Sequence, residues 1–143
     1  MSLRMAVCVI VGLAGCGQAY AAEDYKISAD DSMVIYSGGE QASIDSTDCK
    51  ADGGRVIADF QQQMTTYKEP GHLVACTLEV VSYYPSVLNT HYYAGIFTLA
   101  NDGKRSEVAI CYNDGVGYLK LEPVAAMTRH ELIVYMMDNC TSG

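Results

Sequence analysis

Basic side chains are scarce in this chain of 143 residues, which has nine lysines and arginines against seventeen aspartates and glutamates and a net charge of −8. Proteins that bind nucleic acid or anionic lipid surfaces depend on positive charge, so neither is the expected partner. A protein with a basic surface, in contrast, would be attracted over long distances. We therefore expect no nucleic acid and a cationic protein partner.

Motifs that define common enzyme classes are also missing. The chain contains no G-x-S-x-G, no H-E-x-x-H and no glycine-rich phosphate loop. The cysteines form no C-x-x-C, and no histidine lies at ligand spacing from a cysteine, which argues against zinc. His72, His91 and His130 each fit a structural role beside a turn, a strand or a helix start. We expect a protein without enzymatic activity, metal or cofactor.

No apolar run is long enough to span a bilayer as a helix, which takes ~20 residues. The clearest one, from Met5 to Ala14, is short and follows the positive charge of Arg4. A short apolar core behind a basic residue is typical of an export signal. Residues 1–22 are therefore predicted to be a signal peptide that precedes a single domain over 23–143.

Two cleavage sites compete within this signal. Leu13-Ala14-Gly15-Cys16 resembles the lipobox of bacterial lipoproteins, which implies lipidation of Cys16 and anchoring at the periplasmic face of the outer membrane. Ala19-Tyr20-Ala21 is an A-x-A site that would release a soluble periplasmic protein near Ala21. The two sites exclude each other, and the lipobox is favoured because the apolar core ends directly on it. Contact with a membrane is expected only through such a lipid.

Four further cysteines, Cys49, Cys76, Cys111 and Cys140, remain under either cleavage. An even number of cysteines in an exported protein indicates two disulfides, for which three pairings exist. Pairing Cys49 with Cys76 and Cys111 with Cys140 would connect each expected helix to a neighbouring strand. The other two pairings stay open.

The expected fold is α+β, with an antiparallel sheet of four to six strands that carries its helices on one face. Apolar, β-branched and aromatic runs predict strands over 33–36, 41–45, 72–84, 92–100, 106–112 and 116–122. Asn101-Asp102-Gly103 and Asn113-Asp114-Gly115 are hairpin turns, so the C-terminal half is predicted to be a β-meander.

Two helices complete this prediction. Ile57, Phe60, Met64 and Tyr67 recur at helical spacing, which indicates a helix near 55–68 that ends before Pro70-Gly71. Thr128 and Glu131 form a T-x-x-E capping box, so a C-terminal helix is expected near 128–139.

Tyrosine is the abundant aromatic residue, with eleven copies against two phenylalanines and no tryptophan. Its ring is large and apolar, its hydroxyl is polar, and it loses few rotamers when held, which suits a binding surface. The segment from Tyr83 to Tyr93 is the richest in this residue. The candidate binding residues are Tyr83, Tyr84, His91, Tyr92 and Tyr93.

These features favour an exported binding or inhibitor protein without catalytic activity. Its profile is similar to that of immunity proteins that protect a bacterium against a secreted cell-wall hydrolase, and to that of inhibitors of cationic lysozymes. The alternative is a structural or accessory lipoprotein of an envelope or secretion assembly.

Overall fold

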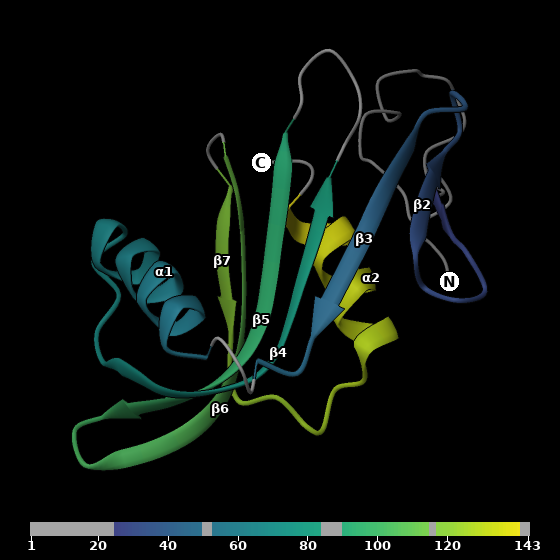
Figure 1. Cartoon of the computed structure of the whole chain (residues 1–143). Helices are drawn as coiled ribbons and strands as arrows, with labels where there is room; N and C mark the ends of the chain where they lie inside the picture. The colour runs from purple at the N-terminus through teal and green to yellow at the C-terminus, as the bar shows by residue number, and fades with distance from the viewer. Residues whose placement is uncertain (1–24, 50–52, 84–89, 115–116, 141–143) are drawn as a thin grey trace, which may run out of the picture.

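A computed structural model describes residues 25–49, 53–83, 90–114 and 117–140, which form one curved antiparallel sheet with two helices (Figure 1). Each strand pairs with the next one in the sequence, so the whole sheet is a meander in the order β1 to β7. The strands are β1 (Tyr25–Ile27), β2 (Met33–Tyr36), β3 (Gln41–Thr47), β4 (His72–Tyr83), β5 (His91–Asn101), β6 (Lys104–Asn113) and β7 (Tyr118–Leu121), and the helices are α1 (Gly53–Thr66) and α2 (Arg129–Cys140).

The predicted antiparallel sheet and both helices are confirmed, but the strand count of four to six was too low. The sheet has seven strands because the polar segment before Met33 contributes β1, whose Lys26 pairs with Ile35 of β2. A three-residue strand of mixed polarity gives almost no periodic signal. The meander therefore includes the N-terminal half as well.

The two helices lie on opposite faces of the sheet, so the prediction of one shared face was wrong. Successive residues of β6 alternate between them: Val108 and Ile110 pack in the core under α1, whereas Ala109 and Cys111 pack in the core under α2. In Figure 1 the central strands run between α1 and α2. Central strands that are apolar on both sides need cover on both sides, because neither face can be left in water.

Helix α1 covers the first face with three buried side chains, Val56, Phe60 and Met64. The ring of Phe60 lies 4.6 Å from the ring of Phe97 on β5. Gln61 ties the helix to the start of β4, because its Oε1 accepts a 2.8 Å hydrogen bond from the backbone N–H of Leu73. These contacts hold the polar side of α1 in a fixed position over the sheet.

Helix α2 begins with the predicted capping box. The backbone N–H of Glu131 donates to Thr128 Oγ1 at 3.1 Å, and the backbone N–H of Thr128 donates to Glu131 Oε1 at 2.8 Å. Both bonds satisfy amides that a helix start would otherwise leave without a partner. Leu132, Ile133 and Met136 then pack against the second face of the sheet.

Both disulfides follow the local pairing. Cys49 pairs with Cys76 and Cys111 with Cys140, with Cα–Cα distances of 5.8 Å and 6.0 Å, and no free cysteine remains among the described residues. The first bridge joins the chain before α1 to β4, and the second joins the end of α2 to β6. Such bridges are compatible with an exported, non-cytoplasmic protein. Cys16 and the predicted signal 1–22 lie outside the described residues.

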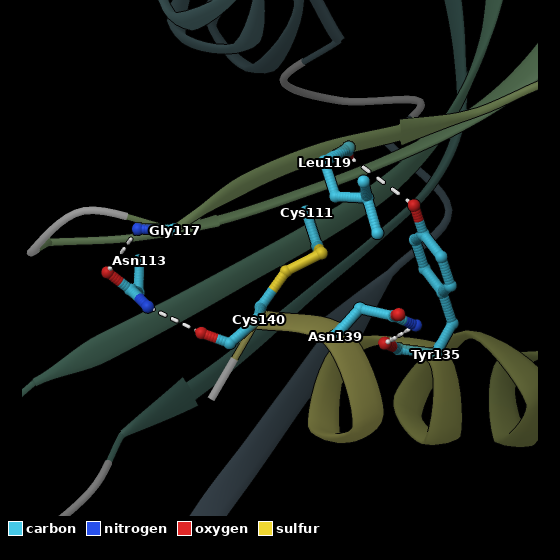
Figure 2. Close-up of a disulfide and its surroundings, with 7 residues drawn as sticks. All are labelled: Cys111, Asn113, Gly117, Leu119, Tyr135, Asn139 and Cys140. Atoms are coloured by element: carbon cyan, nitrogen blue, oxygen red, sulfur yellow. Dashed lines mark hydrogen bonds between the residues drawn. A yellow bond between two sulfur atoms is a disulfide. The ribbon is translucent and has the colours of Figure 1, made fainter. Parts of the chain in front are cut away.

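Polar contacts reinforce the second bridge (Figure 2). Asn113 Nδ2 donates to the carbonyl oxygen of Cys140, and Asn113 Oδ1 accepts a 3.2 Å bond from the backbone N–H of Gly117. The hydroxyl of Tyr135 donates to the carbonyl oxygen of Leu119 on β7 at 3.4 Å. The C-terminal helix is thereby fixed to the last two strands. Within the described part of the chain, neither helix has the length and apolar character needed to cross a bilayer.

Candidate functional site

A cleft of about 610 Å³ opens between α1 and the face of the sheet formed by β3 to β6. Tyrosine and acidic side chains dominate its lining. The lining residues are Asp45, Ser46, Thr47, Arg55, Asp59, Gln63, Glu79, Val81, Tyr83, His91, Tyr93, Tyr112 and Asp114. The side chains therefore come from four strands, from the loop after β6 and from one helix, although they are far apart in the sequence.

Strand register explains why these side chains meet. Asp45 of β3 pairs with Val81 of β4, Val81 pairs with Tyr93 of β5, and Tyr93 pairs with Tyr112 of β6. Residues opposite each other in an antiparallel sheet point to the same face, so this row runs across the floor of the cleft. Tyr83 and His91 form a parallel row two residues away.

Aromatic rings make one wall of the cleft. The ring of Tyr93 stacks on the ring of Tyr112, with centroids 4.8 Å apart, and the edge of Phe60 from α1 meets Tyr112 at 5.0 Å. Burial raises the pKa of Tyr112 far above its usual value, and the neighbouring Tyr93, Asp59 and Glu79 add to this rise. Burial and then Asp114 raise the pKa of Tyr93 in the same direction. Both phenols therefore stay neutral at physiological pH.

Negative charge prevails among the lining residues, because four carboxylates, Asp45, Asp59, Glu79 and Asp114, face one arginine, Arg55. The Glu79 carboxylate lies at the base of α1 with only 9% of its side chain exposed. A buried carboxylate keeps its charge only when cations or hydrogen-bond donors lie nearby. The cleft is thus suited to a positively charged group.

His91 lies at the mouth of the cleft and connects its polar and aromatic parts. Its ring Nδ1 is 3.2 Å from the Tyr93 hydroxyl and 3.7 Å from Asp114 Oδ2, and the edge of its ring meets Tyr83 at 4.8 Å. The backbone N–H of His91 also donates to Asp114 Oδ2 at 3.2 Å. These contacts order the side of the cleft where β5 begins.

Three of the five predicted binding residues, Tyr83, His91 and Tyr93, come together in the cleft. Tyr92 does not, because it points to the opposite face of β5, where it is 8% exposed in the core under α2. We therefore leave Tyr92 out of the candidate site. Tyr84 lies outside the described residues.

Tyr112 and the carboxylates of the cleft were not predicted as site residues from the sequence. Asp45, Glu79 and Tyr112 belong to three different strands, and Asp59 belongs to α1. The alternation along each strand places these residues on one face, but only the pairing between strands brings them to one place. The tyrosine-rich segment from Tyr83 to Tyr93, the clearest local signal, predicted residues at only one end of the cleft.

Among the residues that the structure describes, no group of three or more histidine, cysteine or carboxylate side chains has the geometry of a metal site. Comparison with models of protein families, with curated proteins and with solved structures gives no significant match to this chain. The interpretation of the cleft therefore rests on its own geometry and chemistry.

Proposed function

We propose that the chain is an exported binding protein without catalytic activity, and that its cleft receives a basic group from the surface of a protein partner. The observation that carries this proposal is the coincidence of three tyrosines and four carboxylates in one cleft. Neutral phenols offer apolar faces and hydroxyls together, and carboxylates offer charge. A cation that enters the cleft therefore contacts both aromatic rings and carboxylates.

The size of the cleft allows a protein partner to insert one or two side chains. A volume of about 610 Å³ accommodates a long side chain and its neighbours but no folded element. The exposed ring of Tyr83 at the edge extends the contact outward, since 41% of this residue is accessible. Aromatic residues of this kind dominate the free energy of binding at many interfaces.

In this proposal the partner lies outside the cytoplasm, which the predicted signal peptide and the two disulfides support. An immunity-type inhibitor of a secreted cell-wall hydrolase fits, because a basic enzyme would be attracted by the net charge of −8. Lipidation of Cys16 would keep the inhibitor at the outer membrane, whereas cleavage near Ala21 would release it into the periplasm. The alternative is an accessory lipoprotein of an envelope assembly that uses the same cleft for docking.

Affinity capture from an envelope and culture extract of the native host tests the proposal. The immobilised wild-type protein is expected to retain a basic protein that elutes with salt. Glu79→Gln and Tyr93→Ala are expected to lose this partner. Two control variants are expected to keep it: Glu40→Gln, at an exposed turn outside the cleft, and Tyr67→Ala, at an exposed tyrosine after α1. Equal retention by all four variants would refute the assignment of the cleft.

A further inference from the structure

We infer that the group received by the cleft is the guanidinium of an arginine, and that Arg55 of the chain itself occupies this position until the partner displaces it. This inference rests on the proposed function and specifies its ligand. It starts from one observation: a guanidinium already lies among the carboxylates of the cleft.

Two carboxylates flank Arg55. Its Nη1 lies 3.2 Å from Asp59 Oδ2, one turn further along α1, and its Nη2 lies 3.9 Å from Glu79 Oε1 on β4. The two nitrogens of one planar group thus face two different acids, one from the helix and one from the sheet. This arrangement shows the orientation that a guanidinium adopts between α1 and β4.

The ion pair between Arg55 and Asp59 is open to solvent. The Arg55 side chain is 55% exposed, and the Asp59 side chain is 51% exposed. Exposed pairs at this spacing on a helix contribute little to stability. Arg55 belongs to the first turn of α1 and its side chain is half-exposed, so it can turn towards solvent while the helix stays folded.

A guanidinium that enters from outside has rings and further carboxylates within reach in the same cleft. The stacked pair of Tyr93 and Tyr112 lines the same cleft, and Asp45 and Asp114 add carboxylates from β3 and from the loop after β6. Arginine stacks on aromatic rings and forms paired hydrogen bonds with carboxylates, whereas the compact ammonium of lysine is more strongly hydrated. The mixture of rings and acids therefore favours arginine over lysine.

The test uses three small probes, N-acetylarginine amide, N-acetyllysine amide and N-acetylcitrulline amide. Each is titrated into the purified protein, expressed with its full N-terminal sequence, while the ring resonances of Tyr93 and Tyr112 are followed by NMR. We expect the arginine probe to shift both resonances, the lysine probe to bind more weakly, and the uncharged citrulline probe to have no effect.

The decisive variant is Arg55→Met, compared with Arg105→Met. Arg105 is an exposed residue at the opposite end of β6, so both variants lose one positive charge. Arg55→Met is expected to tighten binding of the arginine probe by roughly two- to fivefold, the effect of one half-exposed ion pair, and Arg105→Met to change it less. Circular dichroism confirms that both variants are folded.

The outcomes separate this inference from the proposed function. Equal affinities of the arginine and lysine probes would overturn the preference for arginine but keep a cation site. Affinity unchanged or lowered by Arg55→Met relative to Arg105→Met would overturn the role of Arg55, and absence of binding by either charged probe would overturn the inference as a whole. Partner capture that still depends on Glu79 would in each case leave the proposed function standing.

Discussion

The ring of Tyr93 on β5 stacks on the ring of Tyr112 on β6 at a centroid distance of 4.8 Å and an angle of 20°. The two residues are direct cross-strand partners, so the stack is built into the register of the sheet. Because Phe60 from α1 supports Tyr112 from the side, the aromatic wall of the cleft is continuous with the core under α1. The wall is therefore held rigid before any partner binds, which lowers the entropic cost of binding.

Replacing Tyr93 by alanine removes half of this stack. We expect the affinity for the captured partner to fall by roughly ten- to a hundredfold, the effect of losing an aromatic anchor. Tyr93→Phe keeps the ring and removes only the hydroxyl near His91, so its loss is expected to be smaller. Isothermal titration calorimetry measures both. Equal affinities of Tyr93→Ala and wild type would show that the stack is not part of the interface.

Gly95 gives a prediction on stability, because a Cβ at this position would lie 2.6 Å from Cζ of Phe97. Phe97 is completely buried under α1, and its ring has little room to move. Gly95→Ala is expected to lower the free energy of unfolding by about 1–3 kcal/mol, the usual cost of overpacking a core. Denaturation in urea measures the change. Gly38→Ala, where a Cβ would meet open space, is the matched control.

The two disulfides are expected to affect different properties. Replacing Cys111 and Cys140 by alanine should lower the free energy of unfolding by ~3 kcal/mol, the value for a bridge that closes a loop of this order, without changing the cleft. Replacing Cys49 and Cys76 releases the chain just before α1, so binding should weaken as well.

Denaturation together with calorimetry distinguishes the two pairs of cysteines. Peptide mapping of the unreduced protein checks the pairing directly. Bridges that connect Cys49 to Cys111 or to Cys140 would contradict the structure.

Alkaline pH should weaken the fold through Tyr135, because burial raises its pKa from 10.0 to about 12. Above pH 10 the unfolded chain releases this proton while the folded chain retains it, so stability falls between pH 10 and 12. The loss at pH 11 is about 1.4 kcal/mol for one unit above the unfolded pKa. Tyr135→Phe lacks this proton, so between pH 9 and pH 11 its free energy of unfolding should fall by about 1.4 kcal/mol less than that of wild type. A decline equal to that of wild type would contradict this role.

Local signals in the sequence predicted most elements of this fold. The capping box of Thr128 and Glu131 and the turn at Asn101-Asp102-Gly103 depend on a few adjacent residues, and both appear where expected. Strand β1 was missed because three residues carry no measurable period. The sides of the helices were assigned wrongly, because central strands that are apolar throughout do not reveal which face each helix covers.

The candidate site was predicted only in part, for a reason that lies in the sheet. Tyr83, His91 and Tyr93 are neighbours in sequence and were found together. Tyr92 and Tyr93 point to opposite faces of β5, which tyrosine content alone does not show. Glu79 became part of the site only through its pairing in the sheet and its place under α1.

The affinity of the captured partner for wild type and for Glu79→Gln tests the central claim most directly. This substitution keeps the shape of the side chain and removes its charge at the base of the cleft. Calorimetry is expected to show binding at least tenfold weaker, since removing one partner of a buried charge pair costs roughly 2–5 kcal/mol. Glu40→Gln should bind as wild type does. Equal affinity of wild type and Glu79→Gln would contradict the assignment of the cleft as a binding site for a basic group.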